Sequence, residues 1–269
     1  MECDDDEAAW SLVRRLRSAA AATWRTGDPH GIDVNAIEYL DARSLALLRE
    51  DGNDRKAGVV VPDGARTALL VTLELPRGMN AAQTYEEIGR ASEPGAPDTP
   101  LVRFCALLAE HELLDAVEFA PPGESDRVAQ LTELREAVPT AVNRRVGRAQ
   151  QEVHARIEKI AADVIVPFER VPALLDFCAR AFGERDLDAA VWGHASDGNL
   201  HPNVIPHAYR DVAAGREAIL AIGREAIRLG GSPLAEHGVG RNPTKQQLLG
   251  ELYGDSGINQ MRRIKASLD

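Results

Sequence analysis

The chain has 269 residues, of which 44% are hydrophobic, so it is long enough for one large domain or two small ones with cores of their own. Its formal net charge of −11 argues against nucleic acid as a partner, because phosphate binding requires a basic surface. No window holds the roughly 18 to 20 apolar residues of a membrane-spanning helix, and the N-terminus is acidic, unlike a signal peptide. Three widely separated cysteines fit a reducing compartment, so we expect a cytoplasmic protein without a transmembrane segment.

The first half of the chain shows mainly helical periodicity, interrupted by short apolar runs. Prolines and glycines mark the connections between these segments. The expected elements are helices near 6–24 and 35–50, a half-buried strand at Ala68–Leu75, a loop at 92–100, a helix over 101–114, a short strand at Ala116–Ala120 and helical structure over 124–152.

The second half has a clearer order of elements. Its pattern predicts a strand at 163–167, a helix at 170–183, strands at 188–194 and 200–206, a helix at 211–229 and a last helix at 256–268. This strand–helix–strand–strand–helix order is typical of a ferredoxin-like α+β unit with an antiparallel sheet. The strands of the first half are expected to form a matching half, so that helices cover one sheet built from two β-α-β type halves.

These elements suggest three segments. We expect an N-terminal helical segment at 1–60, an α+β substrate and metal domain at 61–242, and C-terminal helices at 243–269.

Two short glycine-interrupted segments carry most of the candidate chemistry. The first, GHASDGNLHPN at 193–203, places His194 and His201 at the end of one expected hairpin. The second, AEHGVGR at 235–241, adds Glu236 and His237, and Gly230-Gly231 allows the chain to turn back toward the hairpin. Two imidazoles and one carboxylate leave coordination positions open, as in a catalytic metal site. Zinc, manganese and iron all fit such donors, although histidines in loops are also common without any metal.

The same segments resemble a known family. GHASDGNLHPN, followed by GGSPLAEHGVGR and INQMRRIKASLD, is similar to the C-terminal substrate domain of FAD-linked oxidases of the vanillyl-alcohol-oxidase superfamily. Members with this pair of motifs resemble D-lactate, glycolate and D-2-hydroxyglutarate dehydrogenases. The similarity is specific over about 130–269, where LREAVP and DVIVPFERVP also occur in order, and weaker over 35–120.

The resemblance implies a role for individual residues. It implies that His194, His201 and Glu236 hold a divalent metal that binds the hydroxyl and carboxylate oxygens of a small 2-hydroxy acid. His237 is then the base that takes the hydroxyl proton while a hydride leaves C2 for the flavin. The implied substrate-binding residues are Asn203, Arg135 as the partner of the substrate carboxylate, and Lys159 as a weaker second cation.

The resemblance also implies FAD as cofactor, yet no glycine-rich flavin-binding segment occurs in the sequence. We therefore expect the FAD-binding domain to be absent from this chain, which looks cut at both ends, and expect the chain alone not to oxidise a hydroxy acid. It is then a fragment, a subunit that joins a separate flavoprotein, or a remnant. Two other functions stay open: a flavin-free metal protein such as a hydrolase, and a non-catalytic assembly module.

Overall fold

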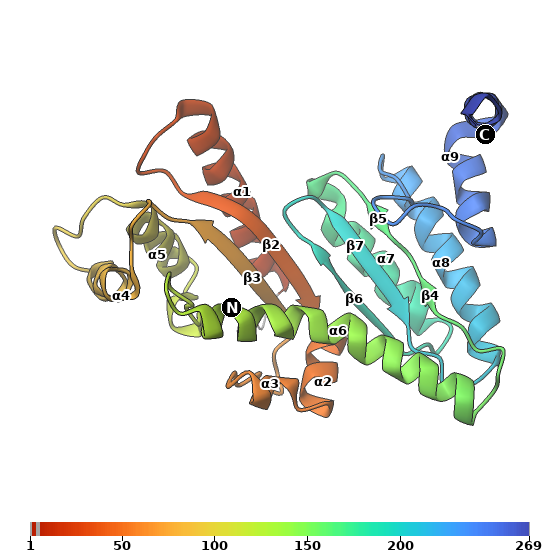
Figure 1. Ribbon diagram of the computed structural model, residues 1–269, viewed down its shortest axis with the longest axis horizontal. Coiled ribbons are helices and arrows are strands. Elements are labelled where there is room, and N and C mark those ends of the chain that lie inside the picture. The colour runs from red at the N-terminus through yellow and green to blue at the C-terminus, as the bar shows by residue number, and fades with distance from the viewer. Residues whose placement is uncertain (1, 4–5, 269) are drawn as a thin grey trace. The chain divides into compact units, whose positions relative to one another are not determined.

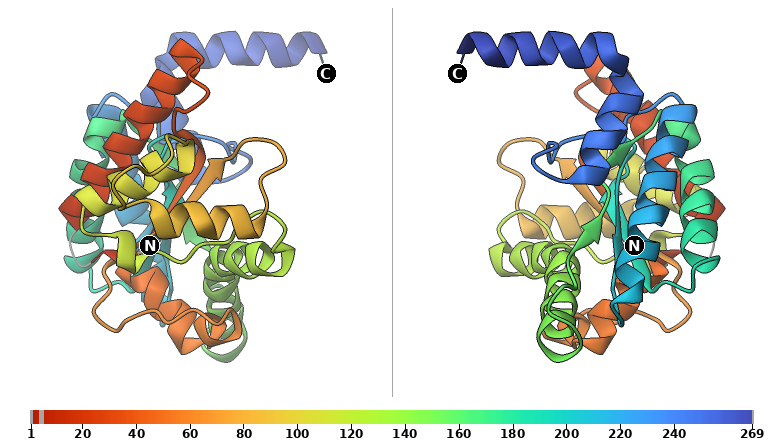
Figure 2. Two further views of the ribbon diagram at one scale, coloured as in Figure 1. Left: turned by 90° about the vertical axis from the view of Figure 1, so that its left-hand side faces the viewer. Right: turned by 90° about the vertical axis from the view of Figure 1, so that its right-hand side faces the viewer.

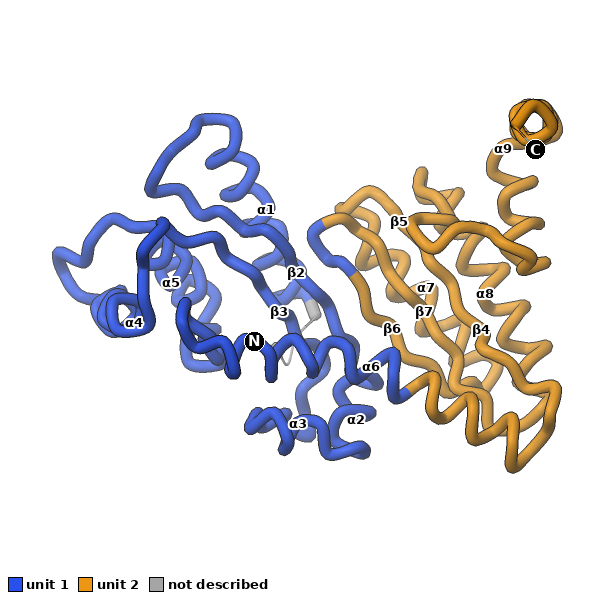
Figure 3. The backbone as a smooth tube through the Cα atoms, in the orientation of Figure 1, with its two compact units in different colours: residues 1–141, 194–196 blue, residues 142–193, 197–269 orange. Residues whose placement is uncertain are grey.

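The computed structural model describes residues 2–3 and 6–268 of the chain, and it divides into two compact units. Unit 1 holds residues 1–141 with 194–196, and unit 2 holds 142–193 with 197–269 (Figure 3). The boundary between the units falls inside the long helix α6 (Ser125–Glu152), whereas the predicted segments had boundaries after residues 60 and 242. Among the helices of the described residues, none combines the length and apolarity that are needed to cross a bilayer.

Unit 1 is built on the antiparallel pair of β2 (Asp33–Asp41) and β3 (Thr67–Glu74), with β1 (Glu2–Cys3) on the other edge of β3. Helix α1 (Asp6–Thr26) packs on one face of this pair, where Trp10 lies 5.2 Å from Tyr39 between ring centroids. The first half of α6 crosses the opposite face (Figure 1). The remaining helices of unit 1 are α2 (Ala42–Glu50), α3 (Asn53–Lys56), α4 (Ala81–Arg90), α5 (Pro100–Glu110) and the 3-10 turn η1 (Leu114–Ala116).

Unit 2 is built on β6 (Ala189–His194), of which all residues but His194 lie in this unit, and on β7 (Asn199–Val204), which follows it in a hairpin. The short strands β4 (Ile160–Ala161) and β5 (Val164–Ile165) both pair antiparallel with β7. Helices α7 (Val171–Gly183), which follows the turn η2 (Phe168–Arg170), and α8 (Arg210–Arg228) pack together on one side of these strands (Figure 1). Helix α9 (Pro243–Leu268) contacts α8 and bends at Gly254, so that its second half projects away from α8 (Figure 2).

The predicted α+β class with antiparallel strands, covering helices and a C-terminal helical segment is confirmed. The predicted order of strand, helix, two strands and helix in the second half is also observed, as β5, α7, β6, β7 and α8.

The predicted helix at 35–50 is wrong over its first half, which forms β2. Ile37 and Tyr39 of β2 are buried with the less buried Glu38 between them, as expected for a period of two, and Ile37 lies opposite Val71 of β3. The helix begins only at Ala42, because the carboxylate of Asp41 accepts a hydrogen bond of 2.7 Å from the Ser44 N–H and caps it. The segment 1–60 is therefore not purely helical.

One further expectation differs from the structure. The predicted strand at Ala116–Ala120 is wrong: the chain forms η1 and then runs without regular structure into Pro121, where Glu118 pairs with Arg127. The expected C-terminal helices are observed as α9, and the predicted helix at 256–268 corresponds to the part of α9 that follows the non-helical backbone at Gly254. The first half of α9 packs through the buried Leu248, whereas Gly250 and Gly254 weaken the helical signal of the sequence there.

Candidate functional site

Four side chains of unit 2 form a candidate metal site. Asp163, His201, Glu236 and His237 each offer one ligand atom, and these atoms all lie within 4.8 Å of one another. The structure thus brings together three residues that the sequence singled out, and it adds Asp163, which the sequence analysis missed. Asp163 and His201 are buried, whereas Glu236 and His237 are exposed.

Strand β7 positions His201. Because side chains alternate along a strand, Asn199, His201 and Asn203 share one face, and Leu200 and Val204 share the other. The apolar face of β7 is turned toward α8, since a Cβ on Gly215 of that helix would lie 3.4 Å from the Val204 side chain. The hairpin therefore presents a row of three buried polar side chains on the face opposite the helices.

The segment that carries Glu236 and His237 is tied to β5 by backbone hydrogen bonds. Ser232 and Ile165 exchange two such bonds, both of 2.8 Å, and the Ala235 N–H donates to the carbonyl of Asp163 at 3.1 Å. The carboxylate of Asp163 continues this pairing, because its Oδ2 accepts from the N–H groups of Glu236 and His237 at 2.8 and 2.6 Å. Asp163 thus sets the position of both site residues.

Gly231 permits this approach of the segment to β5. A Cβ at this position would lie 2.0 Å from the carbonyl oxygen of Ile165 and 2.8 Å from the Cα of Val166. Since both contacts are with backbone, we expect Gly231→Ala to lower the free energy of unfolding by about 3 kcal/mol. Urea denaturation followed by circular dichroism measures the change.

The matched control is Gly250→Ala in α9, where a Cβ would meet no atom within 4 Å. This substitution is expected to be neutral or to stabilise the chain by about 0.5–1 kcal/mol, because alanine favours a helix more than glycine does. Equal stabilities of the two variants would contradict a role for Gly231 in the close approach.

The distances between the donor atoms fit a divalent ion. Glu236 Oε1 lies 3.4 Å from His201 Nε2 and 3.2 Å from His237 Nε2. Two ligand atoms around a tetrahedral zinc ion, each roughly 2.0–2.2 Å from the metal, lie roughly 3.3–3.6 Å apart. Imidazole nitrogens and carboxylate oxygens are also the donors that zinc, manganese and iron accept.

Three buried oxygens around the cluster accept no hydrogen bond within the described part of the chain: Asp163 Oδ1, Asn199 Oδ1 and Asn203 Oδ1. Asn203 is held in place, because its Nδ2 donates to the carbonyl of His201 at 3.0 Å. A buried acceptor without a donor costs about 1–3 kcal/mol. The site therefore favours an occupant that carries positive charge or hydrogen-bond donors.

The other predicted metal ligand, His194, belongs to unit 1 and interacts there with Glu38 of β2. Its Nδ1 lies 3.1 Å from Glu38 Oε1 and 3.0 Å from Glu38 Oε2. Arg135 of α6, the predicted partner of a substrate carboxylate, lies beside the same glutamate, with its Nε 3.5 Å from Oε2. Burial opposes the charge of Arg135, but its hydrogen bond to Glu136 and the charge of Glu38 outweigh burial and raise the pKa of the guanidinium.

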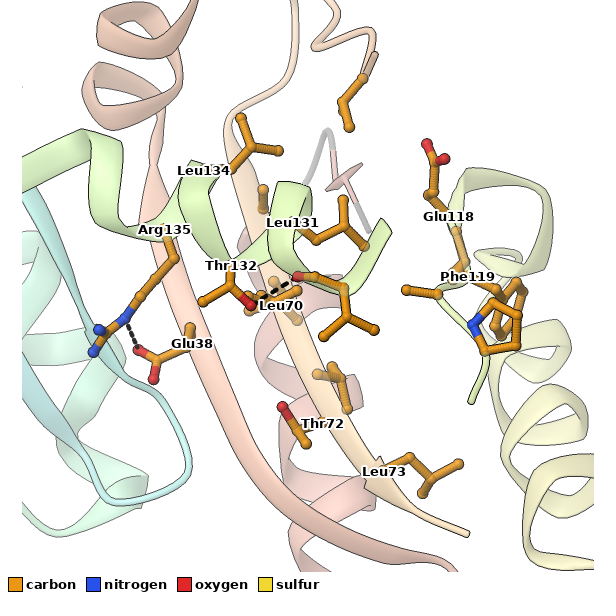
Figure 4. Close-up of a pocket in the computed structure, with 18 of the residues that line it drawn as sticks. Glu38, Leu70, Thr72, Leu73, Glu118, Phe119, Leu131, Thr132, Leu134 and Arg135 are labelled. Carbon is orange, nitrogen blue, oxygen red and sulfur yellow. Dashed lines mark hydrogen bonds and ion pairs between the residues drawn. The ribbon is translucent and has the colours of Figure 1, made fainter. Parts of the chain in front are cut away.

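The pair of Glu38 and Arg135 lies at one end of a large cavity in unit 1 (Figure 4). The cavity has a volume of about 1090 Å³ and lies between β3, the first half of α6 and the segment around Phe119. Leucines from β3 and α6, among them Leu70 and Leu131, contribute to its apolar lining.

Lys159, the weaker substrate-binding candidate, directly precedes β4. It lines a small cavity of about 60 Å³ in unit 2 together with Arg216 and Lys245. Although the residue as a whole is exposed, desolvation of its ammonium group lowers the pKa of Lys159 below the usual value. Its role in substrate binding stays a prediction.

The sequence analysis missed two acidic residues of these sites, Glu38 and Asp163. Glu38 could not be placed because residues 35–50 read as a helix, whereas it lies on β2. The signal for Asp163 was present, since an aspartate directly before the apolar run VIV is unusual for a buried strand.

Comparisons with known proteins agree with the motifs. The family model for FAD linked oxidases, C-terminal domain, matches residues 7–269. An uncharacterized FAD-linked oxidoreductase of Mycobacterium tuberculosis is 30% identical over 241 residues, which cover 89% of this chain and 44% of the relative. The glycolate oxidase subunit GlcD of Bacillus subtilis is 27% identical over 87% of this chain and 42% of its own length. The mitochondrial D-lactate dehydrogenase (cytochrome) of Kluyveromyces lactis is 25% identical over 89% and 36%. The chain spans less than half the length of these relatives.

Proposed function

Because the chain belongs to the family of FAD linked oxidases, C-terminal domain, we propose that it is the substrate- and metal-binding portion of an FAD-dependent 2-hydroxyacid dehydrogenase. The predicted resemblance to this superfamily is confirmed by the family match and by the glycolate oxidase and D-lactate dehydrogenase relatives. The observation that carries the proposal is the cluster of Asp163, His201, Glu236 and His237. The substrates are D-lactate-like acids, which are oxidised to 2-oxo acids.

His201, Glu236 and His194 hold the divalent metal in this proposal. The spacing of His201 Nε2 and Glu236 Oε1 supports the first two ligands, and the resemblance supplies the third. When bound, the metal polarises the substrate hydroxyl and lowers its pKa, and FAD, held by an FAD-binding domain or subunit, accepts the hydride from C2. Zinc, manganese and iron are the candidates.

His237 is the base. Its side chain is 61% exposed and therefore open to a substrate, and its Nε2 lies 3.2 Å from Glu236 Oε1. When Nε2 carries the proton that faces Glu236, Nδ1 keeps the lone pair that accepts the hydroxyl proton.

Arg135, Asn203 and Lys159 orient the acid. The guanidinium of Arg135 suits a bidentate pair with the substrate carboxylate, and the buried Oδ1 of Asn203 accepts a hydrogen bond from the substrate. Lys159 supplies a second cation. The cytoplasmic location predicted from the sequence is kept as a part of this proposal.

The test combines metal binding with substrate oxidation. The chain is expected to bind close to one zinc or manganese ion, and, when supplied with an FAD-binding domain, to reduce a dye with a D-2-hydroxy acid. His237→Ala is expected to keep the metal and to lower kcat by roughly 10²–10⁴-fold, because only the proton acceptor is removed. Calorimetric metal titration and dye reduction measure the two effects.

Three other outcomes would contradict parts of this proposal or favour another function. Loss of the metal in His237→Ala makes His237 a ligand and removes its assignment as the base. Hydrolysis without flavin that stops on chelation favours a metal-dependent hydrolase. A chain that binds no metal and oxidises no D-2-hydroxy acid in the presence of flavin refutes the proposal.

A further inference from the structure

We propose that Glu38 and Asp163 are positioning residues that fix the same tautomer, with the proton on Nδ1, in His194 and His201. Each histidine then presents the lone pair of Nε2 as its ligand atom. The use of this tautomer for metal binding rests on the proposed function, whereas the tautomer itself is a property of the metal-free chain.

The first observation comes from unit 1. Both carboxylate oxygens of Glu38 lie close to His194 Nδ1, at 3.1 and 3.0 Å, and the Glu38 side chain is only 16% exposed. Arg135 lies 3.5 Å from the same carboxylate and helps to hold it in place. An ionised carboxylate only accepts hydrogen bonds, so the neutral imidazole beside it carries its proton on Nδ1.

The second observation comes from unit 2 and is independent of the first. Asp163 is 2% exposed, and its Oδ2 accepts hydrogen bonds from the N–H groups of Glu236 and His237. Its Oδ1 lies 3.6 Å from His201 Nδ1 and accepts no hydrogen bond from the described residues. A shift of about 0.6 Å brings the two atoms to normal hydrogen-bond distance and satisfies the buried oxygen.

The tautomer decides which nitrogen can bind an ion. A neutral imidazole has one N–H and one lone pair, and only the lone pair coordinates a metal. In His201 the nitrogen opposite Nδ1 is Nε2, which lies 3.4 Å from Glu236 Oε1, the spacing of two ligands of one ion. Carboxylates that orient metal-binding histidines in this way commonly change metal affinity by about 10–100-fold.

The primary test is the tautomer in the parent chain and needs no variant at the two carboxylates. Long-range ¹H–¹⁵N spectra of the metal-free, ¹⁵N-histidine-labelled chain at pH 8.5 distinguish Nδ1–H from Nε2–H. His194→Gln and His201→Gln assign the two rings. Both are expected to carry Nδ1–H, and a proton on Nε2 in either ring overturns the proposal for that ring.

Two variants test whether the carboxylates themselves set the tautomers, because a purely structural role would leave the tautomers unchanged. In Asp163→Asn the backbone N–H groups of Glu236 and His237 can be satisfied only by the amide oxygen, so the NH₂ group faces His201 and shifts its proton to Nε2. In Glu38→Gln one of the two oxygens beside His194 Nδ1 becomes an NH₂ group that competes with the remaining oxygen, so the fraction of His194 with its proton on Nδ1 is expected to fall. Each variant is expected to change one ring and leave the other as an internal control for folding.

Zinc titration of the same chains completes the experiment. Each variant is expected to weaken zinc binding by about 10–100-fold, whereas Glu133→Gln, an exposed change on α6, leaves affinity and both tautomers unchanged. Unchanged tautomers and zinc affinity in both amide variants contradict the positioning role. If the parent chain shows Nδ1–H in both rings but binds no metal, the proposed function fails while the tautomer assignment stands.

Discussion

Replacement of Glu236 by glutamine is expected to lower the zinc affinity of the chain by more than about 100-fold, beyond the usual effect of a residue that only orients a ligand. The amide of glutamine has nearly the same shape, but it lacks the negative charge of the carboxylate. In the parent chain the carboxylate Oε1 lies 3.4 Å from His201 Nε2 and 3.2 Å from His237 Nε2. With an FAD-binding domain supplied, kcat for a D-2-hydroxy acid is expected to fall by about 10³-fold or more, because the metal no longer polarises the hydroxyl. Competition titration with a zinc indicator measures the affinity.

The matched control for this substitution is Glu169→Gln, an exposed glutamate of η2 in the same unit. It removes the same charge from unit 2 without touching the cluster, so zinc affinity is expected to stay unchanged. Parent-like zinc binding in Glu236→Gln excludes Glu236 as a ligand, whatever the effect on oxidation.

Replacement of Asp163 by alanine is expected to lower the free energy of unfolding by about 3–5 kcal/mol. The variant removes the acceptor of two backbone hydrogen bonds, of 2.8 and 2.6 Å, and hydrogen bonds to a charged group contribute about 1.5–3 kcal/mol each. It also leaves a cavity at a position that is 2% exposed. Urea denaturation followed by tryptophan fluorescence measures the loss.

Asp197→Ala in the β6–β7 loop is the control for this effect, since Asp197 is exposed and lies in the same unit. Its change in stability is expected to stay within about 0.5 kcal/mol. A loss as small as this in Asp163→Ala means that the Glu236 and His237 N–H groups find other acceptors, and it removes Asp163 as the residue that holds their segment.

The sequence predicted those elements whose pattern agrees with their environment. The helix over 170–183 and the strands at 188–194 and 200–206 correspond closely to α7, β6 and β7. Apolar residues recur with the helical period in α7 and alternate with polar residues in β7, whereas β6 is a short, continuously apolar run. Where packing outweighs the local pattern, the prediction failed. Residues 35–41 contain helix-forming residues such as Ala36, Glu38 and Leu40, but six paired positions with β3 hold them in a strand.

The candidate site shows the same division. His201, Asn203, Glu236 and His237 could be named from the sequence, because their two motifs are short and the functional residues within each lie close together along the chain. Their convergence in unit 2 depends on β7, on Gly231 and on the hydrogen bonds of Asp163. The hydrogen bonds of Asp163 join residues 73 and 74 positions apart, and no local pattern encodes them.

The sequence by itself determined the family of this protein, the α+β class and the histidines and glutamate that carry its candidate chemistry, because these depend on local motifs and on periodicity. Only the tertiary structure decided which carboxylates lie beside the Nδ1 atoms of the two histidines. Glu38 meets His194 across 156 positions of the chain, and Asp163 lies beside His201 and beneath the Glu236 segment. Such pairs form when strands distant in sequence are placed together by packing, so the direction and partner of each imidazole are properties of the folded chain.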